Sequence, residues 1–156
     1  TEPDPRIDLS GLDVKRKLLI LARESGFELE LANIQTTAFL PDGALNTSTV
    51  NEFLALLAQN EQHFVSLFHE ANTQQKKLKF VAELAIGPDH QIEAKVGLKR
   101  VDSSSDYYTL SGSDNILILY TARYQKQPLV IKGAGAGADV TASGIFGDII
   151  RASNHR

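Results

Sequence analysis

The chain has 156 residues, of which 42% are hydrophobic and 22% charged, and its formal net charge is −3. These values are typical of a single globular domain and give no electrostatic basis for binding nucleic acid or an anionic membrane. The absence of cysteine excludes disulfides and thiolate chemistry and is compatible with a cytoplasmic protein, and no apolar run is long enough to cross a bilayer.

The first seventeen residues, TEPDPRIDLSGLDVKRK, concentrate charged groups. Pro3 and Pro5 predict an extended, stiff lead-in, because each proline restricts its own φ and disfavours helical geometry in the residue before it. Ser10 and Asp13 fit the S/T-x-x-D/E pattern, which predicts an N-cap at Ser10 and a helix from Asp13 to Glu24. Gly26 then supplies the stop signal.

Asp13 and Lys17 are four residues apart and therefore lie on one face of the predicted helix. In one interpretation they form an ordinary surface ion pair. In the other, Lys17 is a general acid or base or an electrostatic clamp, with carboxylates around it that bind a cationic or hydroxyl-bearing substrate. The apolar run 18–21 predicts that the helix is deeply buried against a sheet, which would fix the position of Lys17. The spacing alone leaves both interpretations open.

Helical and extended patterns alternate through the middle of the chain. A helix from about Val50 to Ala71, capped by Thr47 or Ser48, is predicted with a break near 60–62. Its two histidines, His63 and His69, face different sides and predict no metal site. Period-two alternation predicts a hairpin over 76–100. Residues 27–31 are predicted to form a short strand or an extended link, and residues 35–40 a second extended segment that ends in a turn at 41–43.

The C-terminal part predicts strands over 116–124 and 129–131, a glycine-rich loop over 133–138 and a helix over 141–152. Gly133, Gly135 and Ala138 satisfy G-x-G-x-x-A, but no second strand with an acidic residue follows, so the dinucleotide-binding fingerprint is incomplete. The loop is then either a tight strand-to-helix turn or a loop that approaches a ligand, including an independent phosphate site.

Two blocks, EPDPRIDLSGLDVKRKLLILARESG and KGAGAGADVTASGIFGDIIR, resemble the catalytic-region signatures of the homoserine dehydrogenase family. The segment LARESGFELELANI is more similar to bifunctional aspartokinase–homoserine dehydrogenases than to monofunctional ones. The resemblance implies an α+β fold, with a mixed or antiparallel sheet and helices packed on one face, that lacks the nucleotide-binding Rossmann domain. The start at Thr1 and the absence of methionine likewise suggest an excised piece of a longer protein.

The resemblance also implies an activity, the NAD- or NADP-dependent interconversion of L-aspartate 4-semialdehyde and L-homoserine in threonine and methionine biosynthesis. Lys17 would be the catalytic lysine, hydrogen-bonded by Asp13. Glu2 and Asp8 would bind the substrate ammonium group. Asp4 and Arg6 match the motif as braces of the loop. The sequence departs from the family at Ile7, where an aspartate is usual, which removes one negative charge near the site.

For the cofactor, the resemblance implies that Gly137 contacts the nicotinamide end, with Gly135 and Gly133 making room for it. Residues 1–132 would form the substrate-binding, catalytic and dimerisation domain. Residues 133–156 would return to the missing nucleotide-binding domain, so the helix is expected to be exposed, reoriented or docked on a neighbour here. The fragment alone is expected to be inactive. A homodimer through the sheet is expected, and the alternative function is a dimerisation module without catalysis of its own.

Overall fold

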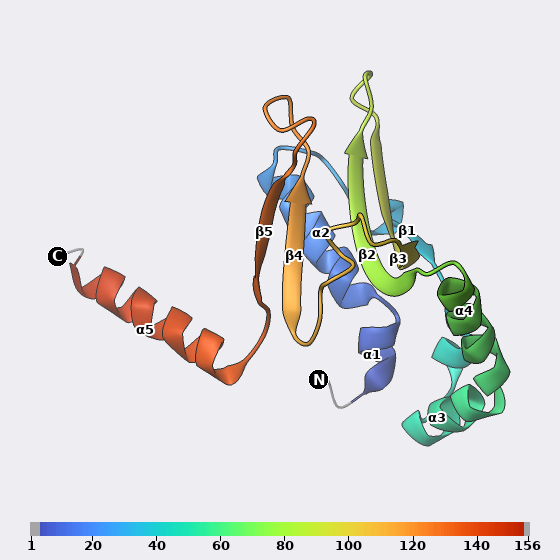
Figure 1. The fold of residues 1–156 in the computed structure, drawn as a ribbon. Coiled ribbons are helices and arrows are strands. Elements are labelled where there is room, and N and C mark those ends of the chain that lie inside the picture. Colours follow the sequence, from blue (N-terminus) through green and yellow to red (C-terminus); the bar gives the residue numbers. More distant parts are fainter. Residues whose placement is uncertain (1–3, 155–156) are drawn as a thin grey trace. The chain divides into compact units, whose positions relative to one another are not determined.

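The computed structural model describes residues 4–154 (Figure 1). The chain divides into two compact units, whose boundary in the sequence falls between Asp102 and Ser103. Helices are combined with one mixed sheet, in the first unit, and one antiparallel sheet, in the second. The predicted α+β class is therefore confirmed. Among the described residues, no helix has both the length and the apolar character that crossing a membrane requires.

The segment predicted as an extended lead-in forms a short helix, α1 (Pro5–Leu9). Asp4 is its N-cap, with extended backbone, and its carboxylate accepts a hydrogen bond from the Arg6 backbone N–H. Pro5 occupies the first turn, where its missing N–H removes no helical hydrogen bond. The prediction of an extended lead-in was thus wrong for residues 5–9, since the restriction before a proline applies to Asp4 and not to the residues that follow.

A sharp corner at Gly11 joins α1 to α2 (Leu12–Glu24). Ser10 is the C-cap of α1, and Gly11, with φ 73°, takes the N-cap position of α2 that was predicted for Ser10. The Ser10 hydroxyl nevertheless accepts a hydrogen bond from the Leu12 N–H over 3.2 Å. A Cβ built on Gly11 would lie 2.6 Å from Cζ of Phe80, in the sheet below. Only glycine combines this backbone angle with so close an approach, and the start of α2 therefore rests directly on the sheet.

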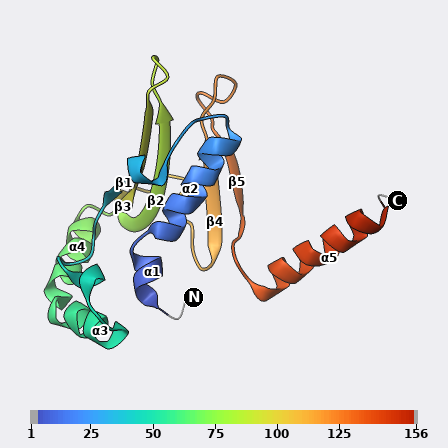
Figure 2. The same cartoon turned by 180° about the vertical axis from the view of Figure 1, so that it is seen from behind.

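Helix α2 is buried on one face only. Leu18 and Ala22 are buried, and α2 packs on the sheet through this face (Figure 2). Ile20 and Leu21 are 60% and 43% exposed, so the prediction of deep burial was wrong. An apolar run of four covers more than the roughly 100° stripe that a single sheet can bury. The predicted stop is confirmed, since Gly26 adopts φ 85° just after the C-cap.

The mixed sheet has the order β1-β3-β2 and contains the predicted hairpin, β2 (Lys77–Ile86) and β3 (Ile92–Val101). The short β1 (Gln35–Thr37) pairs in parallel with β3. Residues 27–30 form no strand and lead as an irregular link into η1 (Leu31–Asn33). The core between α2 and the sheet consists of six buried residues: Leu18, Ala22, Leu29, Ile34, Ala94 and Val96.

The predicted long helix is two helices, α3 (Val50–Gln59) and α4 (Glu61–Thr73), which confirms the break near residue 60. The short η2 (Ala44–Asn46) precedes them. The N-cap is Thr49, one residue beyond the predicted pair, and its hydroxyl accepts a hydrogen bond from the Glu52 N–H. Phe53 of α3 is fully buried, whereas Phe68 of α4 is 68% exposed.

The second unit contains a hairpin, β4 (Asp114–Leu119) and β5 (Leu129–Ala134), and the long helix α5 (Ala138–Asn154). Strand β4 is shorter than predicted, because the chain turns between Thr121 and Tyr124. Strand β5 is longer and takes in Gly133, which was predicted to lie in the loop. Helix α5 has no buried residue among those described, and its apolar side chains are exposed as expected: Val140, Ile145, Phe146, Ile149 and Ile150.

Candidate active site

Lys17 and Asp13 meet as the spacing predicts. The Lys17 Nζ lies 2.8 Å from Oδ2 of Asp13, and the two side chains are 61% and 54% exposed. An ammonium group has three N–H donors, so this bond leaves two that can reach a ligand. The pair is thus held on a helix whose opposite face is locked in the core, and its free donors are open to a bound molecule.

The predicted substrate carboxylates are less well defined. Glu2 lies outside the described residues. Asp8 is an exposed residue of α1, and among the described residues no ion pair joins it to Lys17. The structure therefore brings Asp13 and Lys17 together but does not bring Asp8 into contact with them.

Asp4 and Arg6 brace the segment that carries Asp8. Nε and Nη2 of Arg6 donate to the Asp4 carboxylate over 2.9 and 2.6 Å. Nη1 of Arg6 donates to the backbone carbonyl of Thr47, 41 residues away in the sequence. The side-chain hydrogen bond from Arg6, helped by its backbone N–H, lowers the pKa of Asp4, and the same bond raises the pKa of Arg6. Helix α1 is thereby tied to the segment before α3.

The three glycines of the predicted cofactor loop have different environments. Gly133 lies inside β5, paired with Asn115. The Gly135 N–H donates to the carbonyl of Ser113, the residue before β4, over 3.0 Å, so the backbone at Gly135 is still hydrogen-bonded to the β4 side of the hairpin. Gly137 directly precedes α5, and a Cβ built on it meets no atom within 4 Å. Of the three, Gly135 is closely packed, while Gly133 and Gly137 border open space.

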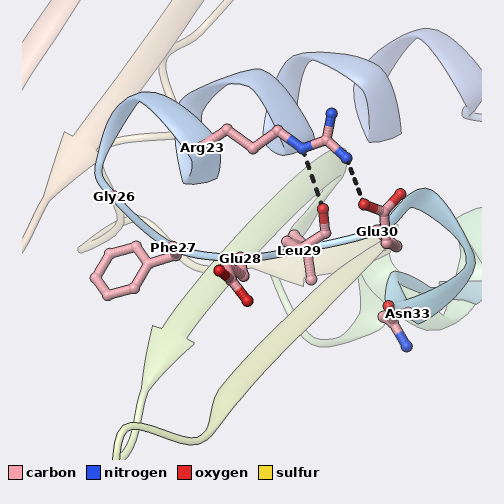
Figure 3. A pocket seen from close by; sticks show the side chains of 7 residues that line it. All are labelled: Arg23, Gly26, Phe27, Glu28, Leu29, Glu30 and Asn33. Carbon is pink, nitrogen blue, oxygen red and sulfur yellow. Dashed lines mark hydrogen bonds and ion pairs between the residues drawn. The ribbon is translucent and has the colours of Figure 1, made fainter.

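An open pocket lies at the C-terminal end of α2 (Figure 3). Arg23 extends over it and donates to the Leu29 carbonyl over 3.2 Å and to the Glu30 carboxylate over 2.8 Å. These bonds hold the link 27–30 against the helix, so we assign Arg23 a structural role. None of the predicted site residues is in the lining, which consists of Arg23, Gly26, Phe27, Glu28, Leu29, Glu30 and Asn33.

The described histidines make no metal centre. His63 Nε2 lies 2.8 Å from the Phe39 carbonyl, on the protein surface. Within residues 4–154, no three His, Cys, Asp or Glu side chains are grouped so that they could hold an ion.

Sequence reasoning missed two residues that make close contacts in the segments of the candidate site. Gly11 sets the start of α2 on the sheet, and its signal was the glycine inside D-L-S-G-L-D, which marks a turn between two short helical patterns. Asn115 lies against Gly135, and no local pattern indicates this contact because twenty residues separate the two in the chain.

Comparison with known proteins identifies the family. The sequence model of the homoserine dehydrogenase family matches residues 1–150. A bifunctional aspartokinase/homoserine dehydrogenase of Haemophilus influenzae is 43% identical over 155 residues, which are 99% of this chain and 18% of the relative. A homoserine dehydrogenase of Saccharomyces cerevisiae is 40% identical over 152 residues, which are 97% of this chain and 41% of the relative.

Solved structures agree with the sequence comparison. A Candida auris protein of unknown function has 35% identity and a TM-score of 0.84, with 99% of this chain and 42% of that one covered. Staphylococcus aureus homoserine dehydrogenase at pH 6.5 has a TM-score of 0.69 at 17% identity, with 99% and 33% covered, which shows the fold alone. The chain spans less than half the length of these relatives and matches the family model along nearly its whole length. It belongs to the homoserine dehydrogenase family.

Proposed function

We propose that this chain is the substrate-binding and catalytic region of a cytoplasmic homoserine dehydrogenase, which interconverts L-homoserine and L-aspartate 4-semialdehyde with NAD or NADP. The nucleotide-binding Rossmann domain would lie in a part of the protein outside these residues. The Lys17–Asp13 pair carries the proposal, because an accessible ammonium is fixed on a core-packed helix within the block that resembles the family's catalytic signature. The full-length protein should reduce NAD or NADP when homoserine is added, and failure to do so contradicts the proposal.

Lys17 supplies the proton chemistry. Reduction of an aldehyde places negative charge on its oxygen, and an ammonium within hydrogen-bond reach both stabilises that charge and donates the proton. In the reverse direction the same nitrogen accepts the proton of the homoserine hydroxyl. Asp13, which lies 2.8 Å from Nζ, holds the Lys17 side chain along the face of the helix. We assign Lys17 as the catalytic residue and Asp13 as its positioning residue.

Asp8 and Glu2 would bind the ammonium group that both substrates carry. A primary ammonium needs carboxylate acceptors, and Asp8 is exposed on a segment that the Asp4–Arg6 pair holds in place. Ile7, where the family usually has aspartate, is 40% exposed and leaves Asp8 as the acidic residue at this point of the chain.

The glycine loop fits a nicotinamide cofactor. Gly137 directly precedes the first turn of the 17-residue helix α5, and the space where its side chain would stand is open. Backbone without a Cβ allows a planar ring to approach closely. The cofactor, when bound, carries the hydride that is exchanged with the substrate carbon. Residues 133–137 would bind and orient its nicotinamide end, with Gly137 as the main contact.

Gly137→Ala tests this contact. The added methyl meets no atom of the chain, so the fold should be unchanged and the Michaelis constant for NAD(P) should rise about tenfold in the full-length protein. Gly87→Ala is the matched control, because its Cβ would make only ordinary contacts in the turn between β2 and β3. Equal cofactor constants for the two variants contradict a cofactor contact at Gly137.

By function, we divide the chain into a catalytic and dimerisation domain, 1–132, and a returning loop and helix, 133–156. We further propose a homodimer through the sheet. Leu129 and Ile131 lie on one face of β5 and are 39% and 54% exposed, which supports an apolar surface of this kind. Sedimentation of the protein as a dimer is expected, and a monomer at micromolar concentration contradicts it.

A further inference from the structure

The glycine loop is packed against one side chain, that of Asn115. Asn115 is the cross-strand partner of Gly133, and in an antiparallel pair its side chain can also reach the diagonal neighbour two residues on, Gly135. Its amide nitrogen occupies the place that a Cβ on Gly135 would take. The amide therefore lies directly on the Gly135 backbone.

Gly135 is held from a second side as well. Its N–H donates to the Ser113 carbonyl over 3.0 Å, and a Cβ on Gly135 would lie 2.8 Å from that same carbonyl oxygen. Gly135, the residue after the end of β5, is therefore still hydrogen-bonded to the neighbouring chain segment at the start of β4. Two residues later the open position at Gly137 begins, so the direction of the loop is set at Gly135.

The contact with Asn115 is one of packing. Among the described residues, the Asn115 side chain takes part in no hydrogen bond or ion pair, and the residue is exposed. Its neighbour Asp114 instead pairs with Lys132 across the strands over 3.5 Å. Asp114 thus makes the ion pair across the strands, whereas the Asn115 side chain packs on the glycine backbone.

We propose that Asn115 is a positioning residue for the cofactor loop: its amide, packed on Gly135, fixes the path by which Gly137 reaches the cofactor. This inference rests on the proposed function, since it takes the loop as the cofactor contact. It assigns a role to a residue outside the glycine block itself. It also explains why residue 135 has no side chain although it has no left-handed backbone angle.

Truncation of Asn115 tests the packing. In the full-length protein, Asn115→Ala should raise the Michaelis constant for NAD(P) about fivefold, with kcat at saturating cofactor and the constant for homoserine nearly unchanged. Asn115→Leu, of similar shape but without hydrogen-bonding groups, should restore the cofactor constant. Gln127→Ala is the control, because it removes an exposed amide from the loop that connects β4 and β5, at the opposite end of the hairpin from Gly135. An unchanged constant in Asn115→Ala, or no restoration by leucine, overturns the inference.

A double-mutant cycle gives the second measurement. Gly135→Ala alone should raise the cofactor constant more than Asn115→Ala, because the methyl overlaps both the amide and the Ser113 carbonyl. Adding Asn115→Ala to Gly135→Ala should recover part of the loss, since one of the two overlaps is removed. Effects that simply multiply show that the two residues are not coupled and overturn the proposal.

Hydrogen exchange separates this inference from the proposed function. The Gly135 amide should exchange faster in Asn115→Ala than in the wild type, whether or not the protein oxidises homoserine. A wild type without homoserine-dependent reduction contradicts the function, and the exchange result still tests the packing. An active wild type with equal exchange and equal cofactor constants in Asn115→Ala overturns the inference and leaves the function in place.

Discussion

Replacement of Lys17 by alanine should lower kcat of the full-length enzyme by about 10³-fold, because the group that donates the proton and stabilises the oxyanion is lost. The Michaelis constant for the cofactor should change little. Loss of folding is excluded as the cause, since the side chain is 61% exposed and its pair with Asp13 is a surface ion pair worth about 0.5 kcal/mol or less. Steady-state kinetics measures kcat and the Michaelis constant, and thermal unfolding of the same preparation measures stability.

Two control variants test whether the loss of activity is specific to the Lys17 ammonium group. Lys15→Ala removes a lysine from the same turn of α2 but from a different side of the helix, and turnover should stay near that of the wild type. Lys17→Arg keeps the charge but not the ability to release a proton near neutral pH, so activity should stay low. If Lys17→Ala is as active as Lys15→Ala, the pair is an ordinary surface ion pair and the assignment of Lys17 is wrong.

Gly11→Ala should destabilise the protein by about 3 kcal/mol, the sum of a left-handed backbone angle for alanine and the overlap of its methyl with the Phe80 ring. The start of α2 must then move away from the sheet. Because Asp13 and Lys17 lie in the first turns of that helix, activity should fall together with stability. Chemical denaturation measures the change in the free energy of unfolding.

Gly43→Ala is the matched control for Gly11→Ala. Gly43 has nearly the same backbone angle, φ 76°, but a Cβ on it meets no atom within 4 Å. Its substitution should therefore cost only the backbone term, about 1 kcal/mol. The difference between the two variants isolates the contact with Phe80, and equal losses would show that Gly11 is not packed on the sheet as described.

Local sequence patterns predicted correctly those features that depend only on residues within one element or its immediate neighbours. The end of α2 at Gly26, the break at Asn60 and the β2–β3 hairpin follow from a glycine stop, a polar interruption and strict alternation. The pair of Asp13 and Lys17 likewise follows from helical spacing, which needs no knowledge of the rest of the chain.

Other features depended on contacts that no local pattern contains. The S-x-x-D motif at Ser10 matched a helix start, but the Asp4–Pro5 cap begins a separate helix before it, and the chain turns at Gly11. An aspartate followed by a proline is itself typical of a helix N-cap and first turn, and this pattern could have predicted the start of α1. Gly133 was assigned to a loop by composition, whereas its pairing with Asn115 keeps it in the sheet.

Tertiary packing also decided which apolar residues are buried. The run 18–21 is continuous in the sequence, yet the sheet covers Leu18 and leaves Ile20 exposed, because neighbouring helical residues point about 100° apart. The bond from Arg6 to the Thr47 carbonyl spans 41 residues and has no sequence pattern. Such contacts position the candidate site and are seen only in three dimensions.

A crystal structure of the full-length protein with bound homoserine is the most direct test of the central claim. We expect Nζ of Lys17 to lie about 3 Å from the homoserine hydroxyl oxygen while still bonded to Asp13, and the substrate ammonium to contact a carboxylate of the N-terminal segment. Homoserine bound elsewhere, with the Lys17 ammonium directed into solvent, would contradict it.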